Sequence, residues 1–491
     1  MANPDTLLKE LLVVDRNADT PVYLQLAGAV IQHIRQGRFR KGLRLPGSRE
    51  LGELLRINRM TVVAAYRELD AQGWIEMLPR KGTFVKVSPA LAPPKKISEE
   101  SVVFQLPAIP GFRQEGKRIL PVHTPAPSPA RHLILNDGFP DLRLAPVDDL
   151  VRCIRSQSRR SLNKMKGEPQ GTLFLREELT TFLCDTRGLS ITPENILVTK
   201  GAQMGLYLAT TLLIRQQEEV ITGTPGYAGA NHTFRQLGAR INQVAVDKDG
   251  LDIDEVERLC KKKKIRIVYV IPHHHHPTTV TLSPQRRIRL LELAARYRFA
   301  IVEDDYDYDF HYAGKSMMPM ASLDRNGNVI YIGTLTKSLT TSIRVGFIVA
   351  PEQFIRTATG LRRVIDSQGD SLIENALAEL YRNGTIARHL KKSVKIYKER
   401  RDHFCDLLHS ELGRHVSFTI PEGGMGVWTR FTSDSLPAVA RRAFQKGLLM
   451  DNGADYDTEK IKYNSVGFGF ASLNFREQIN VIEVLKSTFT R

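Results

Sequence analysis

A proline-rich stretch divides this sequence into two parts with different patterns. Residues 88–130 contain nine prolines and show little apolar periodicity, which predicts an extended linker of limited flexibility. Residues 1–87 have the length of one small domain, and residues 131–491 have the length of one large domain or two. We therefore expect two separately folded units joined by the linker.

The first part shows three helix patterns followed by a strand hairpin. Apolar residues from Leu26 to Ile34 recur at helical spacing and stop at Gly37. The later elements are helices from Ser48 and from Asn58 to Gly73, and strands Trp74–Leu78 and Thr83–Val87. Three helices with short turns and a basic hairpin predict a winged helix-turn-helix, α+β and mainly α. The alternative is a three-helix interaction module that uses the same pattern for packing.

The third helix is the candidate recognition helix of a DNA-binding domain. Residues in the first turn of such a helix face base edges and phosphates in the major groove. The preceding helix and the wing supply further contacts to the backbone or the minor groove. The predicted contacts to a double-stranded DNA operator are Arg49, Asn58, Arg59, Thr61, Val62, Arg80, Lys81 and Gly82.

The charge of the chain agrees with a polyanionic partner. A formal net charge of +17 fits nucleic acid, although an anionic membrane surface or a merely basic enzyme fits it too. The densest cluster, Lys261–Lys264, follows a helix pattern and is better explained as a solvated helix end. The apolar runs are too short to span a bilayer, and the first residues lack the layout of a signal peptide. We therefore expect a cytoplasmic protein without a membrane partner.

Beyond the linker, helix patterns alternate with short apolar strand candidates. These are Ile196–Thr199, Ile265–Ile271, Phe299–Glu303, Val329–Thr334 and Arg344–Val349. The alternation predicts an α/β domain with a mostly parallel sheet covered by helices. Ligand sites of such domains form at the ends of the strands.

Side chains that suit pyridoxal 5'-phosphate follow these strands. Lys337 lies in a turn between two strand candidates, where its amine can form a Schiff base with the cofactor aldehyde. Asp304, just past a strand, can pair with the ring nitrogen, and Tyr306 can reach the ring hydroxyl. Taken singly, a turn lysine and an acidic run are usually surface features, so the combination of motifs carries the prediction.

The cofactor phosphate requires several donors. Gly201, Ala202 and Gln203 open a helix after a strand, so their N–H groups and the helix dipole can cradle an anion. The Arg344 guanidinium can add a two-pronged contact, and the Tyr227 ring can stack on the cofactor. The predicted cofactor-binding residues are Gly201, Ala202, Gln203, Tyr227, His274, His276, Asp304, Tyr306, Thr334, Thr336, Lys337 and Arg344, with Lys337 as the catalytic Schiff-base lysine.

Both parts of the chain resemble known families. The segments Leu45–Leu51, Asn58–Val62 and Gly73–Ile75 resemble the GntR-type winged helix of bacterial repressors. Residues 131–491 resemble fold-type I aminotransferases, on motifs that contain Gly171, Gly201–Gln203, Tyr227, Asp304, Tyr306, Lys337 and Arg344. Together they resemble the MocR subfamily of transcription regulators. The resemblance implies a bacterial, pyridoxal phosphate-dependent regulator that forms a head-to-tail homodimer and presents two winged helices to spaced half-sites.

A histidine run departs from the pattern of that subfamily. Aligned on Pro277, His274 takes the family's histidine position, and His276 takes the place of an asparagine near the ring oxygen in true aminotransferases. Thr279 replaces the family's glycine. The run His273–His276 could instead bind a metal, but neighbouring loop residues point in different directions and cannot all converge on one ion. We predict no metal site.

A second departure concerns the arginine that grips the substrate carboxylate in true aminotransferases. In the register set by Phe470, Gly467 takes its position, so the two-pronged carboxylate contact is missing. Arg430 and Arg476 remain alternative donors. The missing contact disfavours turnover of amino acids, although a residual half-reaction stays open.

The sequence thus predicts a transcription regulator whose aminotransferase-like domain senses pyridoxal phosphate, an amine or an amino acid. Control of vitamin B6 or amino-acid metabolism would suit such an effector. The rival hypothesis is a working aminotransferase with a DNA-binding appendage, since Lys337, Asp304 and Tyr306 are intact. A third hypothesis treats the large domain as a dimerisation scaffold without cofactor.

Overall fold

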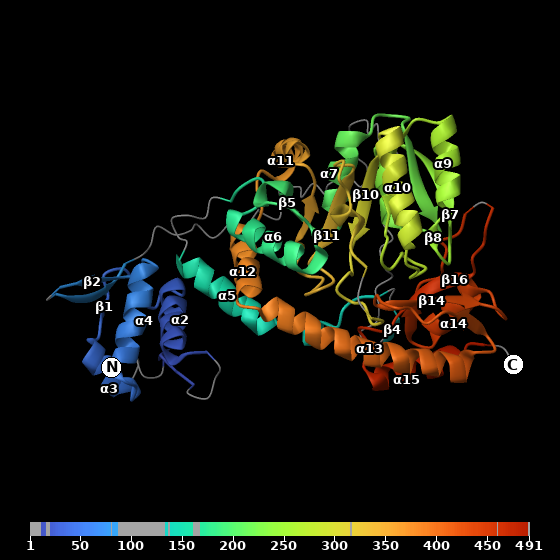
Figure 1. Ribbon diagram of the computed structural model, residues 1–491. Helices are drawn as coiled ribbons and strands as arrows, with labels where there is room; N and C mark the ends of the chain where they lie inside the picture. Colours follow the sequence, from blue (N-terminus) through green and yellow to red (C-terminus); the bar gives the residue numbers. More distant parts are fainter. Residues whose placement is uncertain are drawn as a thin grey trace, which may run out of the picture. The chain divides into compact units, whose positions relative to one another are not determined.

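The computed structural model describes residues 11–15, 20–79, 81–86, 133–135, 138–160, 167–314, 317–458 and 460–489. The chain forms two compact units, Met1–Gln114 and Glu115–Arg491, and each is described by itself (Figure 1). The predicted linker and Arg80 lie outside the described residues. The expected domain borders at residues 87 and 130 therefore stay predictions.

The first unit is a winged helix-turn-helix, which confirms the fold predicted for it. Its elements are α2 (Val22–Arg35), β1 (Arg44–Leu45), α3 (Ser48–Leu55), α4 (Arg59–Ala71), β2 (Ile75–Leu78) and β3 (Gly82–Val85), with the antiparallel strand order β1-β3-β2. Leu26, Val62 and Leu69 are buried in one core between the helices. The sequence does not predict β1, because two residues are too few to show an alternation.

The second unit contains an eight-stranded sheet that is mostly parallel, as predicted. Its strands are β5 (Ile196–Thr199), β6 (Glu219–Thr224), β7 (Arg240–Asp247), β8 (Gly250–Leu251), β9 (Ile265–Val270), β10 (Ala300–Asp305), β11 (Val329–Thr334) and β12 (Gly346–Val349). They follow the order β5-β12-β11-β10-β9-β6-β7-β8, in which β12 and β8 run in the direction opposite to the other six strands. The carboxyl ends of the parallel strands therefore share one edge.

Helices cover both faces of this sheet. Ile267 and Tyr269 of β9 pack in a core with α7, α8 and α11, whereas Val268 and Val270 pack on the opposite side with α9 and α10, as alternation along a strand requires. Helices α9 and α10 lie side by side over the sheet in Figure 1. The helices of this part are α5 (Val147–Arg160), α6 (Leu173–Arg187), α7 (Ala202–Leu213), α8 (Ala228–Gln236), α9 (Ile253–Lys262), α10 (Pro284–Tyr297), α11 (Glu352–Asp366) and α12 (Ser371–Arg382).

A long helix, α13 (Thr385–Leu412), leads into a C-terminal part with its own sheet. This part contains β13 (Val416–Phe418), β14 (Gly426–Phe431), α14 (Leu436–Gln445), β15 (Leu448–Met450), β16 (Ser465–Gly469) and α15 (Phe475–Lys486). Strands β13, β14 and β16 form an antiparallel sheet, and β15 pairs with β4 (Leu133–Leu135). Figure 1 shows α13 packed along α15. Within the described ranges, no helix combines the length and the apolar character that a bilayer crossing needs.

Candidate cofactor site and DNA-binding surface

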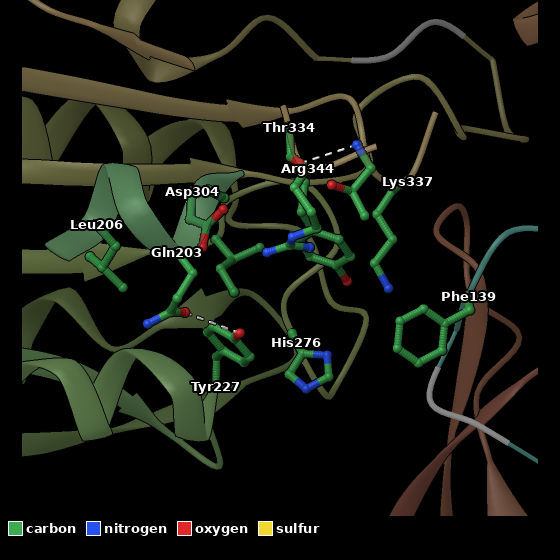
Figure 2. A pocket seen from close by; sticks show the side chains of 13 residues that line it. Phe139, Gln203, Leu206, Tyr227, His276, Asp304, Thr334, Lys337 and Arg344 are labelled. Atoms are coloured by element: carbon green, nitrogen blue, oxygen red, sulfur yellow. Dashed lines mark hydrogen bonds between the residues drawn. The ribbon is translucent and has the colours of Figure 1, made fainter. Parts of the chain in front are cut away.

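The shared edge of strands β6, β9, β10 and β11 opens into a cavity of about 230 Å³. Its lining residues, most of them labelled in Figure 2, are Phe139, Ala202, Gln203, Leu206, Tyr227, Ile271, His276, Asp304, Tyr306, Thr334, Thr336, Lys337 and Arg344. Ten of the twelve predicted cofactor-binding residues are among them. The exceptions are Gly201, which adjoins the cavity, and His274.

The Lys337 amine lies inside this cavity. The loop that carries it begins directly after β11, where the Thr336 N–H donates to the Thr334 hydroxyl at 3.2 Å. The amine itself donates to the carbonyl oxygen of Gly138 at 2.7 Å, and it lies 4.2 Å from the centre of the Phe139 ring. Its position brings a primary amine to the place where an aldehyde cofactor would react.

Asp304 presents an unsatisfied carboxylate oxygen in the same cavity. Its Oδ2 accepts a hydrogen bond from the Tyr269 hydroxyl at 2.6 Å, whereas its buried Oδ1 has no hydrogen-bond partner. Burial raises the pKa of this carboxyl to about 6, so it is mostly ionised at neutral pH. A buried carboxylate oxygen without a donor is costly, and the protonated ring nitrogen of pyridoxal phosphate would supply a donor to Oδ1. The site therefore fits the cofactor.

Tyr269 holds the Asp304 carboxylate, so its replacement by phenylalanine is expected to weaken cofactor binding. Loss of the hydroxyl leaves Oδ2 without a donor and raises the Asp304 pKa further above 6. A lost hydrogen bond to a charged group corresponds to roughly 10- to 100-fold in affinity. Absorbance titration with pyridoxal phosphate at pH 7 and pH 9 measures it, and the loss should shrink at pH 9, where Asp304 ionises again. An equal loss at both pH values would contradict this role of Tyr269.

A positively charged recess lies beside the amino end of α7. Gly201 has a φ of +81°, and a Cβ added there would meet the Arg344 guanidinium at 3.0 Å. A glycine is thus required both by the backbone conformation and by the close approach of Arg344. The structure describes no carboxylate paired with Arg344, so the guanidinium and the first N–H groups of α7 together suit a phosphate.

Gln203 orients the Tyr227 ring. The Tyr227 hydroxyl donates to Gln203 Oε1 at 3.3 Å (Figure 2), and Gln203 Nε2 donates to the Thr233 hydroxyl at 2.6 Å. The Tyr227 ring meets His276 edge-on, with 5.5 Å between the ring centres. The side chain of Gln203 is therefore engaged with its neighbours, which leaves its backbone N–H as the group available to an anion.

The histidine run sends its rings to different partners. His273 contacts the Met317 carbonyl oxygen, His275 the Thr278 hydroxyl, and His276 the Tyr456 hydroxyl at the cavity wall. The His274 ring turns away from the cavity, with Nδ1 2.9 Å from the Asp307 carboxylate and Nε2 3.4 Å from His311. The expected ring contact of His274 with the cofactor is therefore wrong, because the Asp307 carboxylate holds this ring elsewhere.

Thr279 has a backbone conformation that glycine adopts more readily than threonine, which explains why the family has a glycine at this position. Its φ is 62°, in the left-handed region that β-branched residues rarely adopt. It lies with Gly467 and His276 around a smaller recess next to the main cavity. The described residues contain no group of three side chains that could hold a metal ion.

Gly467 lies beside the cofactor cavity, and its predicted place at the position of the carboxylate-binding arginine stays a prediction. It borders the same small recess as Gly138 and Tyr306, and it pairs with Trp428 across the sheet of the C-terminal part. Among the described residues, Arg344 is the only arginine that lines the cavity or this recess. The alternative donors Arg430 and Arg476 are exposed and line neither.

Four residues of the site were not predicted: Phe139, Leu206, Ile271 and Tyr269. Leu206 and Ile271 have only apolar character, which in a sequence indicates core packing. Tyr269 stands within an apolar strand pattern, so its hydroxyl carries no separate signal. The Gly-Phe-Pro turn at residues 138–140 is the one visible feature near Phe139, and it does not point to a distant lysine.

The amino end of α4 presents the predicted recognition surface of the first unit. Asn58 caps the helix by accepting from the Met60 N–H at 2.8 Å, and Arg59 and Arg49 are exposed beside it. Thr61 is half-buried. Met60, which was not predicted, has a 63% exposed side chain, and an apolar group at this place suits a thymine methyl.

Val62 is a correction to the predicted DNA contacts. Its side chain is fully buried in the core of the winged helix, on the same face of α4 as Leu69. Because α4 has one apolar face, a residue that packs in the core cannot reach a base edge.

In the wing, Lys81 is exposed, and Gly82 has a φ of +118° with Arg44 close by.

Replacement of Arg59 by alanine is expected to weaken DNA binding about tenfold and to reduce the slope of log affinity against log salt by about 1, as for one lost phosphate contact. Arg59 is exposed, so the stability of the fold should change by less than about 0.5 kcal/mol. Fluorescence anisotropy with a labelled duplex at several salt concentrations measures both values. Arg67→Ala is the matched control, because Arg67 is exposed on α4 beyond its first turns; equal losses in both variants would exclude a special role for Arg59.

Two family descriptions match the chain. "Bacterial regulatory proteins, gntR family" matches residues 22–85, and "Aminotransferase class I and II" matches residues 135–456. The probable rhizopine catabolism regulatory protein MocR of Rhizobium meliloti is 30% identical over 89% of this chain and 87% of its own length. The transcriptional regulator TauR of Rhodobacter capsulatus is 27% identical over 91% and 92%.

The second unit is also similar to solved aminotransferases. A kynurenine aminotransferase of Pyrococcus horikoshii, in complex with PMP, has a TM-score of 0.68 and 26% identity over 73% of this chain and 91% of that chain. An archaeal alanine:glyoxylate aminotransferase has the same TM-score and 30% identity over 72% and 90%. These matches cover both units and the cavity at the strand ends.

Proposed function

The chain belongs to the MocR-type regulators, in which a gntR-family domain precedes an aminotransferase class I and II domain, and on this premise we propose that it couples occupancy of the cavity to DNA binding. It is a DNA-binding transcription regulator that depends on pyridoxal phosphate. We further propose that it forms a head-to-tail homodimer in the bacterial cytoplasm and binds operator DNA on the nucleoid. The identity of its effector is also part of the proposal.

The observation that carries the proposal is the convergence of three groups on one cavity. Lys337 brings an amine, Asp304 an unsatisfied carboxylate oxygen, and Arg344 a guanidinium next to the start of α7. When bound, pyridoxal phosphate supplies an aldehyde for the amine and an electron-withdrawing ring. Arg344 and the start of α7 would bind its phosphate, Tyr227 and the apolar lining would hold its ring, and the Lys337 amine would lie within reach of its aldehyde.

The lining of the cavity favours sensing over turnover. An amino-acid substrate brings a carboxylate, and enzymes that act on such substrates grip it with a forked donor. Arg344 lies next to Gly201 at the start of α7, which supports a role in binding the phosphate, and Gly467 offers no side-chain donor. We therefore propose pyridoxal phosphate itself as the effector, with control of vitamin B6 supply, and an amine or amino acid as the second candidate.

The test is a DNA-binding titration with and without pyridoxal phosphate, on the DNA upstream of the protein's own gene. A large change in affinity or footprint supports the coupling, because an effector shifts an equilibrium only by its differential affinity for two states. Unchanged binding would refute pyridoxal phosphate as effector.

A second assay addresses the rival hypothesis of an active aminotransferase. The holoprotein is mixed with a panel of amino acids, and absorbance follows the conversion of bound aldehyde to amine. We expect at most slow conversion. Rapid conversion by any common amino acid would overturn the proposal that the domain is a sensor.

A further inference from the structure

The first half of α13 carries a row of cations that the cofactor site does not use. Residues 385–398 contain no aspartate or glutamate, but they contain Arg388, Lys391, Lys392, Lys395 and Lys398. All five are exposed. The buried side of the same half-helix is formed by Ile386, Leu390 and Tyr397, which pack in the main core. The five cations thus form one solvent-facing row, which we call the α13 stripe.

The stability of the helix does not explain the α13 stripe. Its first members lie near the amino end of α13, where the helix dipole is positive and favours anions. Like charges three and four residues apart repel each other. By contrast, Lys261 and Lys262 lie at the carboxyl end of α9, where the dipole favours cations, and Lys261 also pairs with Glu257 at 3.0 Å.

In the described part of the chain no ion pair neutralises the centre of the stripe, and the exposed Glu399, four residues after Lys395, is the nearest acidic residue along the helix. Lys398 pairs with Asp402 at 2.9 Å, and the Arg388 guanidinium donates to groups at the start of its own helix. Lys391, Lys392 and Lys395 pair with no carboxylate that the structure describes. From Arg388 to Lys398 the stripe extends over about 15 Å of helix, a length along which a DNA duplex presents several phosphates.

We propose that the α13 stripe binds the phosphate backbone of double-stranded DNA, as a second contact surface outside the winged helix. The inference rests on the DNA binding of the proposed function and extends it to the aminotransferase-like unit. A duplex is favoured over an anionic membrane because a helix that lies on a membrane buries an apolar face in it. The apolar face of α13 is already packed inside the protein.

The test compares two triple variants of the full-length holoprotein with equal changes in charge. In the first, Lys391, Lys392 and Lys395 become glutamine. In the control, Lys261, Lys262 and Lys264 become glutamine, at the helix end where the dipole accounts for them. The probe is a labelled 60-base-pair duplex of random sequence, titrated at several salt concentrations. The absorption spectrum of the bound cofactor reports that each variant is folded.

Loss of three phosphate contacts should reduce the slope of log affinity against log salt by about 2 to 3 and weaken binding roughly tenfold or more. The control variant should keep the wild-type slope, and Lys391→Arg with Lys392→Arg and Lys395→Arg should keep it too. Equal losses in both glutamine variants, or none in the α13 variant, would overturn the inference. A wild-type protein that does not bind any duplex would instead refute the proposed function. Unchanged DNA binding with lost binding to phosphatidylglycerol vesicles would assign the stripe to a membrane surface and overturn the inference as well.

Discussion

Replacement of Lys337 by alanine should abolish the visible absorption band of covalently held pyridoxal phosphate. The Lys337 amine is the only lysine amine that lines the cavity in the described part of the chain, and a methyl group cannot form the bond to the aldehyde. The cofactor should then bind only through noncovalent contacts with Asp304, Arg344 and the start of α7, and dialysis should remove it. Spectra before and after dialysis measure the effect.

Two further variants separate the covalent bond from the charge of Lys337. Lys337→Arg keeps a cation that can still donate to the Gly138 carbonyl, yet its guanidinium does not replace the amine as a nucleophile. It should lose the band as the alanine variant does. The exposed Lys446→Ala should keep it. A band that persists in Lys337→Ala would show that another amine holds the cofactor, and the assignment of the cavity would then be wrong.

The fold was largely predictable because its core patterns are local. In α4, Val62, Ala65, Tyr66 and Leu69 recur at helical spacing, and all four are buried. Strand β11 ends at Thr334, the polar residue that closes its apolar run. Strand β6 was not predicted, since Glu219–Thr224 mixes glutamate, threonine and glycine. Only its pairing with β7 and β9 buries its centre, and a pairing is not visible in a single strand.

The residues of the candidate site could be predicted where the chemistry requires one residue type. Contacts between segments that are far apart in the sequence could not be predicted. An amine, a carboxylate and a guanidinium have few substitutes, so Lys337, Asp304 and Arg344 could be named. The carbonyl of Gly138 reaches Lys337 across 199 residues of sequence, and nothing local indicates that approach. Two predicted contacts failed because a residue's type and its place in a motif do not fix the direction of its side chain. The His274 ring contacts Asp307, and the Val62 side chain is buried in the core of the winged helix.

Replacement of Asp304 by asparagine should weaken cofactor binding while it stabilises the protein without cofactor. Asparagine can still accept from the Tyr269 hydroxyl, but it offers no charge to the ring nitrogen. The loss of a charged hydrogen bond in a buried site corresponds to roughly 100-fold in affinity. Absorbance titration with pyridoxal phosphate measures this loss, and Asp185→Asn, at an exposed position of α6, is the control.

The effect of the same substitution on stability follows from the Asp304 pKa. Burial raises that pKa from 3.8 to about 6, so the folded protein binds the proton more tightly than the unfolded chain. Stability without cofactor therefore falls as the pH rises from about 4 to 6, and above pH 6 the full cost of roughly 3 kcal/mol is present. Asparagine removes this cost, so urea unfolding should show a larger gain at pH 8 than at pH 5.

Opposite signs in the two measurements would distinguish a ligand-binding carboxylate from a structural one. A carboxylate kept for the fold loses stability when it is replaced, whereas a buried anion held for a ligand costs stability until the ligand arrives. If Asp304→Asn destabilises the cofactor-free protein at both pH values, Asp304 has a structural partner and its unsatisfied oxygen is no sign of a ring nitrogen. If the cofactor-free protein gains stability and affinity falls, the uncompensated charge of Asp304 is the part of the cavity that pyridoxal phosphate completes.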